Sequence, residues 1–378
     1  MAHWKHVYSP MDGSNGKLDY HKRSLPKLSF GVELEFALAT IPYQRTDPDP
    51  EDGRQVYGIT QREDRALAKE LPADRARRAQ EHISNTLTEA GFSSIREPDS
   101  DGQPREQYLD RWIITQDSSI KGPSGELRYS FQPIEMQSPA YLMTEGSLKE
   151  VQRVCHLMTK TYRTYSGPTS SVHVHVGNKK QGFPLETLQN LMALLWTFEP
   201  QLETLHPEHR QKNGYCGSMR RSSQLMVRMK LSKIDLRGSL DEIYNTKSIS
   251  ELILLMGFGY GETGYKLGFN MSNLLESYVN DDGEHIHIKS PKKTIEFRHH
   301  EGTMDPVAIY HWTKVCVNFV EFAEEVWTSK LRVWLRCNID RKVVDYPAVA
   351  VLCALKIPVQ AMYYEKKLAE RGDDPNRT

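Results

Sequence analysis

Alternating apolar and polar residues predict a strand over residues 28–39. Its apolar face would consist of Leu28, Phe30, Val32, Leu34, Phe36 and Leu38, because successive side chains of a strand point to opposite faces. Glu33 and Glu35 would lie on the other face, about 7 Å apart at the rise of a strand. The pattern predicts a half-buried strand with two carboxylates on its polar face. A solvated sheet face would explain Glu-x-Glu alone equally well.

Three further stretches repeat this arrangement, with apolar residues on one face and ionisable residues on the other. Residues 171–177 place three valines opposite two histidines, and residues 294–298 place two apolar residues opposite a glutamate and an arginine. Residues 131–136 are less regular, because Pro133 restricts them to an edge strand or to the start of a strand. The ionisable residues of these stretches are His173, His175, Glu296, Arg298 and Glu135.

The residue types on these polar faces point to a metal site. A solvated sheet face usually mixes Lys, Thr, Ser and Gln, whereas these strands carry mainly carboxylates and imidazoles. Such groups repel or compete with one another on a single sheet unless cations lie between them. A site for divalent metal ions is therefore the simplest explanation.

Helical periodicity predicts helices between the strands. Apolar residues recur at helical spacing over residues 65–90, with an interruption near Pro72, and over residues 144–162. Pro184 suits the first position of a further helix, and Asp305 suits the N-cap of a long amphipathic helix. Strands interleaved with helices indicate an α+β fold in which helices cover the apolar side of a sheet.

We expect one domain over residues 26–370. Residues 1–25 are polar with Gly and Asp, which predicts a flexible arm, and residues 371–378 have the composition of a disordered tail. Residues 41–64 are rich in proline and acidic residues and predict a long polar loop, which is either a lid or an insertion specific to a family.

Composition narrows the class of protein. The chain has 378 residues, enough for a sizeable core, and its 49 basic and 49 acidic residues give a net charge of zero. A neutral chain argues against nucleic acid as a partner. The five cysteines are scattered without a CxxC motif and indicate reduced thiols. No apolar run approaches the roughly 20 residues of a membrane span, so we expect a soluble, cytoplasmic protein without a membrane partner.

Three other positions are candidates for contacts with a ligand. Asp117 follows a short predicted strand and could bind a metal or a substrate, or form a turn. Arg220 belongs to a basic run over residues 219–247, which suits phosphate near a metal site but also suits a solvated helix face. Asn270 alternates with apolar residues in a predicted strand over residues 267–272, and we expect it to contact substrate.

The order of these motifs resembles the amidoligase family of the glutamine synthetase-like carboxylate–amine ligases. The resemblance spans residues 30–303: Phe-Gly-Val-Glu-Leu-Glu-Phe, a glutamate strand ending in Ser-Pro, Val-His-Val-His-Val-Gly, and Thr-Ile-Glu-Phe-Arg followed by Gly-Thr. A second set is similar to the fungal-type members and consists of Trp196, Phe198, Glu199, His206, Pro207, Arg210, Tyr215 and Cys216. The resemblance implies a curved, mainly antiparallel sheet with a polar metal-binding face.

The resemblance also implies roles for individual residues. Glu33 and Glu35 would each bind one of two Mg²⁺ or Mn²⁺ ions. His173 and Glu296 would complete the site nearer the nucleotide phosphates. Glu135 would bind the second ion, with Asp117, Glu126 or water as a further ligand. Catalytic contacts to phosphate or to an acyl phosphate would come from His175 and Arg298, and Arg210 and Arg220 are further candidates for nucleotide contacts.

The implied reaction transfers the γ-phosphoryl group of ATP to a substrate carboxylate, and an amine then attacks the acyl phosphate to give an amide. The acid and the amine would be small molecules, derived from amino acids or secondary metabolites, and their identities and the oligomeric state stay open. Two alternatives remain. One is another metal enzyme, a hydrolase or an oxygenase, that uses His173, His175 and a carboxylate. The other is a degenerate ligase that only binds nucleotide.

Overall fold

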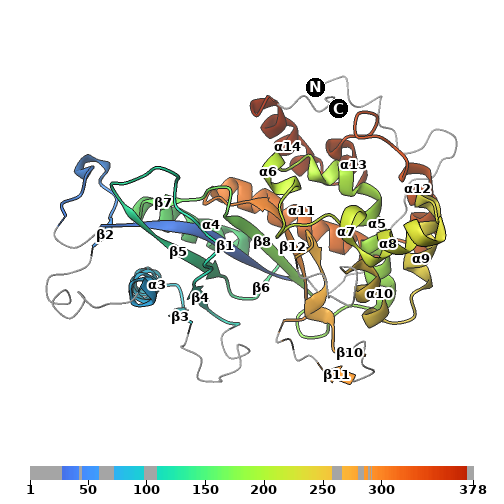
Figure 1. Cartoon of the computed structure of the whole chain (residues 1–378), viewed down its shortest axis with the longest axis horizontal. Coiled ribbons are helices and arrows are strands. Elements are labelled where there is room, and N and C mark those ends of the chain that lie inside the picture. The colour runs from blue at the N-terminus through green and yellow to red at the C-terminus, as the bar shows by residue number, and fades with distance from the viewer. Residues whose placement is uncertain are drawn as a thin grey trace. The chain divides into compact units, whose positions relative to one another are not determined.

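The computed structural model describes residues 28–41, 45–58, 72–97, 109–257, 266–279, 285–287, 290 and 292–372 (Figure 1). The predicted arm over residues 1–25 and most of the predicted tail, residues 373–378, lie outside the described residues. So do residues 42–44 and 59–64 of the predicted loop. The prediction of a single domain over residues 26–370 therefore stays a prediction.

The chain divides into two compact units. The strand unit consists of Ser29–His175 and His300–Thr313, and the helix unit consists of Met1–Leu28, Val176–His299 and Lys314–Thr378. The division falls inside two strands, β8 and β12, so each of these strands contributes residues to both units.

One sheet of ten strands carries the motifs that the sequence singled out. Its order is β3 (Ser94–Arg96), β4 (Trp112–Thr115), β5 (Ser130–Gln137), β1 (Ser29–Ile41), β8 (Ser171–Gly177), β12 (Thr294–Glu301) and β9 (Phe269–Asn270), while β2 (Tyr57–Gly58), β6 (Tyr141–Leu142) and β7 (Thr164–Tyr165) pair with β1. Five of the pairs are antiparallel, namely β1 with β5, β6 and β7, β4 with β5, and β12 with β9. Two are parallel, β1 with β2 and β3 with β4. The prediction of a mainly antiparallel sheet is confirmed.

Strand β1 is buried on both faces, not on one as the alternation predicted. Phe30, Leu34 and Leu38 are at most 2% exposed on the apolar side, and Glu33 and Glu35 are only 8% and 5% exposed on the polar side. The reason is its central place in the sheet, because five strands, β2, β5, β6, β7 and β8, pair with β1. The two carboxylates are thus taken out of water, which is costly unless they find partners.

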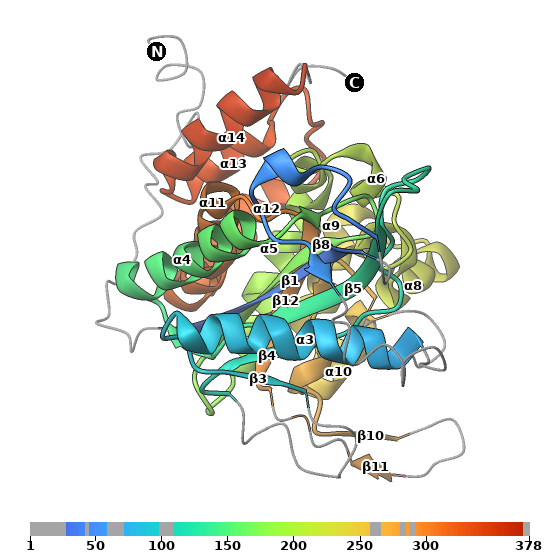
Figure 2. The same cartoon turned by 90° about the vertical axis from the view of Figure 1, so that its left-hand side faces the viewer.

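Helix α3 (Pro72–Glu89) packs against β3, β4 and β5 within the strand unit (Figure 2). Ala79, Ile83 and Leu87 are fully buried, as the helical spacing predicted. Residues 65–71 of the predicted helix lie outside the described residues. Helix α4 (Glu145–Thr161) begins after Thr144, whose side chain accepts a hydrogen bond from the Ser147 N–H at 3.0 Å.

The helix α11 (Pro306–Glu325) begins as predicted. The Asp305 carboxylate accepts a hydrogen bond from the Val307 N–H at 2.9 Å, and Pro306 occupies the first helical position. The peptide N–H groups of the first turn have no partners within the helix, so an aspartate N-cap followed by proline is a stable start.

The helix unit is built around α5 (Leu185–Glu203), whose residues are buried on nearly all sides of the helix. It packs against α9 (Leu236–Asn245), α10 (Ile249–Met256), α12 (Thr328–Asn338) and α13 (Ala348–Ala354). Trp196 donates its indole N–H to the Ser239 hydroxyl at 2.8 Å, which satisfies a polar group in this core. Pro184 is the N-cap of α5 and not its first residue, a shift of one position from the prediction.

The remaining elements are α6 (Glu208–Gln211), α7 (Met219–Ser222), α8 (Gln224–Ser232), α14 (Pro358–Glu370), the short helices η1 (Pro50–Asp52) and η3 (Ser272–Leu274), and the strands β10 (Ser277–Val279) and β11 (His285–His287). Helix α6 is a single turn that follows its N-cap Pro207. Among the described residues, no helix is both long and apolar enough to cross a membrane.

Candidate active site and its carboxylate–imidazole face

The polar face of β1 and β8 brings one carboxylate against two imidazoles. Glu33 Oε2 lies 3.2 Å from His173 Nδ1, and Glu33 Oε1 lies 3.0 Å from His175 Nε2. Both histidines are nearly inaccessible, at 3% and 6% exposed. The alternation of β8 puts its two histidines on the same face, and the neighbouring position of β1 places Glu33 opposite them.

Glu35, two residues further along β1, is held by Ser171 at the start of β8. The Ser171 N–H and hydroxyl both donate to Glu35 Oε2, at 2.8 and 2.6 Å. The same hydroxyl lies 2.8 Å from His173 Nε2. Glu33, His173, Ser171 and Glu35 therefore form one continuous chain of polar contacts across two strands.

A second group of acids gathers beside Glu35. Glu35, Asp117 and Glu135 offer ligand atoms that all lie within 4.8 Å of one another. Gln137 donates from its amide to Glu135 Oε1 at 2.5 Å. Asp117 also forms the turn that the sequence allowed, because its carboxylate accepts a hydrogen bond from the Ser119 N–H at 2.8 Å. Glu126, the other suggested ligand, is paired with Arg128 at 2.8 Å and is not part of this group.

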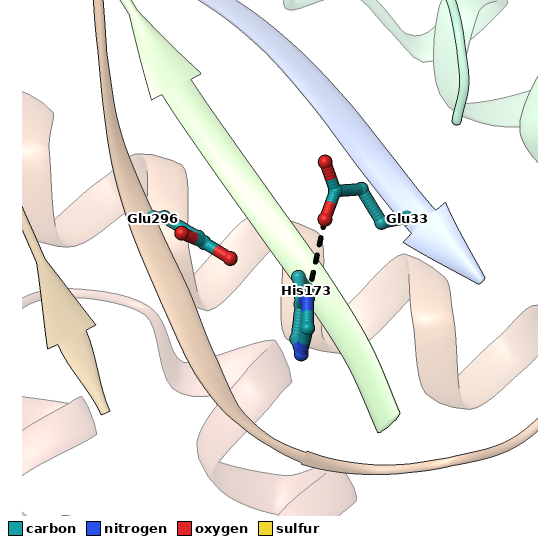
Figure 3. Close-up of side chains that lie close together, drawn as sticks. All are labelled: Glu33, His173 and Glu296. Carbon is teal, nitrogen blue, oxygen red and sulfur yellow. Dashed lines mark hydrogen bonds and ion pairs between the residues drawn. The ribbon is translucent and has the colours of Figure 1, made fainter. Parts of the chain in front are cut away.

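Figure 3 shows a group of three side chains, Glu33, His173 and Glu296, from the neighbouring strands β1, β8 and β12. Each offers a potential ligand atom, and the three atoms lie within 4.8 Å of one another. These are the three residues that the resemblance assigned to one metal ion. All three are buried.

The Glu296 carboxylate has two partners on its own unit. Asn270 lies opposite Glu296 in the β9–β12 pair and donates from its amide to Glu296 Oε2 at 2.7 Å. The Arg298 guanidinium forms an ion pair with Glu296 Oε1 and also donates to the Tyr215 carbonyl at 3.2 Å. The predicted substrate contact of Asn270 and the predicted phosphate contact of Arg298 stay predictions, and both side chains contact Glu296 in the structure.

Burial and the neighbouring carboxylates disfavour the ionisation of Glu135. Burial, followed by the charge of Glu33 and to a smaller extent that of Glu35, raises the pKa of Glu135 to about 8. The hydrogen bond from Gln137 lowers this pKa but does not offset the other effects. Carboxylates gathered in one place disfavour their own ionisation, and a bound cation relieves this repulsion.

The donor atoms in these two groups suit a hard divalent cation. They comprise five carboxylates and one imidazole, Glu33, Glu296, Glu35, Glu135, Asp117 and His173. Mg²⁺ and Mn²⁺ prefer oxygen ligands, and an imidazole is compatible with Mn²⁺ in particular. Each of three carboxylates also receives a hydrogen bond from a neutral donor, since Ser171 holds Glu35, Gln137 holds Glu135 and Asn270 holds Glu296. Such contacts orient metal ligands in known sites.

Arg210 and Arg220, the candidates for nucleotide contacts, point their guanidinium groups at backbone carbonyls. Arg210 donates to the carbonyls of Arg298 and His299, at 2.6 and 3.3 Å. Arg220 donates to the carbonyls of Trp196 and Thr197, at 2.7 and 2.9 Å. These contacts brace helices and a strand within the helix unit. The role of both arginines in nucleotide binding stays a prediction.

Sequence reasoning assigned no role to Ser171 or Gln137. Each lies two residues from a candidate ligand on the same strand, Ser171 from His173 and Gln137 from Glu135, and therefore on the same face. The period of two could have marked both as neighbours of the acids. It could not have shown that Ser171 contacts Glu35, because that contact depends on how β1 and β8 are aligned.

The Gly-Thr pair after β12 has a steric role. The Gly302 N–H donates to the Ser170 carbonyl at 2.9 Å, next to the start of β8. A Cβ on Gly302 would lie 2.4 Å from the Ser170 Cβ, closer than side-chain carbons approach. Glycine at this position therefore allows the chain after β12 to pack against the backbone that leads into the histidine strand.

Comparisons with known proteins agree with the motifs. A family model described as "Putative amidoligase enzyme" matches residues 26–320, well over half of the chain. Among solved structures, the chain is similar to a bifunctional glutathione synthetase from Pasteurella multocida, with 10% sequence identity and a TM-score of 0.34. That match covers 93% of this chain and 47% of the other, so this chain spans about half of that protein's length. No match is found among curated proteins. The match to the family model over residues 26–320 shows that the chain belongs to the amidoligase family.

Proposed function

We propose that the protein is an ATP-dependent carboxylate–amine ligase with a glutamine synthetase-like catalytic fold, and that it forms an amide through an acyl phosphate. The observation that carries the proposal is the pair of side-chain groups, Glu33–His173–Glu296 and Glu35–Asp117–Glu135, in a member of the amidoligase family. Two adjacent groups of hard ligands suit a reaction in which two cations face the phosphates of ATP.

Each group would hold one Mg²⁺ or Mn²⁺ ion. Glu33, His173 and Glu296 would bind the ion nearer the nucleotide phosphates, and Glu35, Glu135 and Asp117 would bind the second ion. Bound cations would neutralise the charge that the phosphates of ATP bring to this acidic face. In this assignment Asp117 is a metal ligand, and the hydrogen bond that its carboxylate accepts from the Ser119 N–H fixes the orientation of the carboxylate.

The other ionisable side chains of the face would bind phosphate. Arg298 would contact the transferred phosphoryl group with a guanidinium already oriented by Glu296 and by the Tyr215 carbonyl. His175, oriented by Glu33 at 3.0 Å, would donate a hydrogen bond to the same group. Both side chains would favour the transition state by positioning and by charge, which supply most of the catalysis in phosphoryl transfer.

The proposed reaction has two steps. A carboxylate oxygen of the acid attacks the γ-phosphorus of ATP, the bond from this phosphorus to the β–γ bridging oxygen breaks, and ADP leaves. The amine nitrogen then attacks the acyl carbon, the bond from this carbon to the phosphate oxygen breaks, and the amine loses a proton as phosphate leaves. One oxygen of the acid therefore ends in the phosphate. We propose small-molecule acids and amines as substrates.

The test is the release of ADP from ATP with Mg²⁺ or Mn²⁺ in pools of carboxylic acids, amino acids and polyamines. We expect release that requires an added acid or amine, that is lost in Glu33→Gln and that is kept in Glu126→Gln. Glu126 is a matched control because its carboxylate is paired with Arg128 outside both groups. Nucleotide binding without ADP release would point to a binding protein. Metal binding without nucleotide binding would overturn the proposal in favour of a hydrolase or an oxygenase.

A further inference from the structure

We propose that Ser171 is a positioning residue that holds one ligand of each metal ion. Its hydroxyl would fix the orientation of Glu35 and select the tautomer of His173 in which Nδ1 is the metal-binding atom. The inference rests on the proposed function, because it assigns Glu35 and His173 to the two ions. It assigns a role to a residue that neither the motifs nor the family match singled out.

The position of Ser171 gives it access to both side chains. Ser171, His173 and His175 lie on the same face of β8, and Ser171 is only 4% exposed. Its hydroxyl oxygen lies 2.6 Å from Glu35 Oε2 and 2.8 Å from His173 Nε2. Its peptide N–H also donates to Glu35 Oε2, at 2.8 Å. All of these contacts are buried and lie within the strand unit.

The single hydroxyl proton determines the direction of both hydrogen bonds. A carboxylate can only accept, so the Ser171 proton must be donated to Glu35. The hydroxyl oxygen is then an acceptor for His173, whose Nε2 must carry the proton of the neutral ring. His173 Nδ1 is left with a lone pair, and it faces Glu33 Oε2 at 3.2 Å. A lone pair facing a carboxylate oxygen is the arrangement that a cation bound by both would stabilise.

The same contacts give the two carboxylate oxygens of Glu35 different surroundings. Two donors from Ser171 point at Oε2, while the His173 Nε2 is 3.7 Å from Oε1, beyond hydrogen-bond distance. Oε1 is therefore the oxygen that would bind the second ion with Glu135 and Asp117. One hydroxyl would in this way couple the geometry of the two ions.

Ser171→Ala removes the hydroxyl and keeps the peptide N–H. We expect about 10- to 100-fold weaker Mn²⁺ binding, the range seen when groups that orient metal ligands are removed. Ser171→Thr keeps a hydroxyl on a residue type that suits strands and should restore binding. Ser170→Ala is the matched control. Ser170 is fully buried, and its hydroxyl has no hydrogen-bond partner in the described part of the chain.

The first measurement is the tautomer of His173 in full-length protein labelled with ¹⁵N-histidine and freed of metal. Long-range ¹H–¹⁵N correlation spectra distinguish the two ring nitrogens, and a His173→Gln sample assigns the signals. We expect the Nε2–H form in the wild type and in Ser170→Ala, and a mixture or the Nδ1–H form in Ser171→Ala. A wild-type ring in the Nδ1–H form, or one unchanged by Ser171→Ala, would overturn the inference.

The second measurement is the affinity for Mn²⁺ without nucleotide, followed by electron paramagnetic resonance. Equal affinities of the wild type and Ser171→Ala would overturn the inference and leave the proposed ligase function standing. A wild type that binds no Mn²⁺ would overturn the metal role of Ser171 together with the proposed function. Weaker binding by Ser171→Ala, with Ser171→Thr and Ser170→Ala near the wild type, would support the inference.

Discussion

Glu35 and Glu135 occupy directly opposite positions in the antiparallel pair of β1 and β5. Side chains in such positions have Cβ atoms about 4.5–5.5 Å apart, and like charges placed there destabilise a sheet. The nearby Asp117 adds a third carboxylate. Unfavourable pairs of this kind occur in proteins mainly at functional sites. The pair of Glu35 and Glu135 lies at the site proposed for the second ion.

Glu135→Gln should therefore stabilise the protein when metal has been removed. Without metal the folded protein keeps Glu135 protonated up to a pH of about 8, whereas the unfolded chain ionises this group near pH 4.5, so folding at pH 7 requires the uptake of a proton. The substitution removes this cost, and we expect a gain of at least about 1 kcal/mol in the free energy of unfolding at pH 7. Urea unfolding in the presence of a chelator measures this gain. The control is Glu126→Gln, which removes a carboxylate with a favourable partner, Arg128, and should not stabilise.

Added Mn²⁺ should reverse the order of these proteins. A ligand that binds only the folded state stabilises it in proportion to the logarithm of its concentration over the dissociation constant. We expect Mn²⁺ to stabilise the wild type and Glu126→Gln more than Glu135→Gln. Equal stabilisation of all three proteins would contradict the assignment of Glu135 as a ligand.

The described part of the predicted polar loop is anchored to the strand unit by Arg163. Its guanidinium donates to both oxygens of Asp47 at 2.8 Å and to the Asp49 carbonyl at 2.5 Å, and it is almost completely buried. Lysine cannot reproduce this two-pronged contact. We expect Arg163→Lys to cost about 1.5–3 kcal/mol, the usual value of a hydrogen bond to a charged group.

Limited proteolysis followed by mass spectrometry tests this anchor. We expect cleavage within residues 45–58 to become faster in Arg163→Lys, while Arg228→Lys, which alters a surface pair with Glu242, behaves as the wild type. If Arg163→Lys is cleaved no faster, the loop is held by other contacts. Faster cleavage with unchanged Mn²⁺ affinity would favour an anchored insertion over a lid.

Glu199 should make the stability of the protein depend on pH. Its carboxylate accepts hydrogen bonds from the Ser218 hydroxyl and from the N–H groups of Met219 and Arg220. Burial nevertheless raises the pKa of Glu199 from 4.5 to about 7. Between these values the folded protein binds more protons than the unfolded chain, so this group lowers stability as the pH rises from about 4.5 to 7, by on the order of 3 kcal/mol.

Glu199→Gln should flatten this dependence. The amide cannot ionise, but its NH₂ group would face a backbone donor, so the variant should be less stable than the wild type near pH 5. The difference in unfolding free energy between the two proteins should shrink as the pH rises from 5 to 8. A constant difference across this range would show that Glu199 is ionised throughout.

Much of the fold was predictable because alternation is a local property. The alternation of apolar and polar residues predicted two strands, one with Glu33 and Glu35 and one with His173 and His175, and the structure has both. Within each strand the polar residues share one face, as predicted. Their burial was not predictable from this pattern. Glu33 and Glu35 are buried because strands distant in the sequence pair with β1, which only the tertiary fold determines.

Other residues show the same limit in different ways. The charge of Arg210 and Arg220 suggested phosphate, yet their guanidinium groups donate to backbone carbonyls, which residue type cannot reveal. Asp117 could be a ligand, a substrate contact or a turn residue, and only the fold places it beside Glu35 and Glu135. The contact of Ser171 with Glu35 joins residues 136 positions apart.

The most direct test of the proposed ligase chemistry is to trap the acyl phosphate with hydroxylamine. Hydroxylamine replaces the unknown amine, so only ATP, Mg²⁺ or Mn²⁺ and pooled carboxylic acids are needed, and the hydroxamate product is identified by mass spectrometry. We predict one hydroxamate for each ADP released, no product without ATP, and none from Glu33→Gln. Release of ADP without hydroxamate, or hydroxamate formed without ATP, would contradict activation of a carboxylate by phosphoryl transfer.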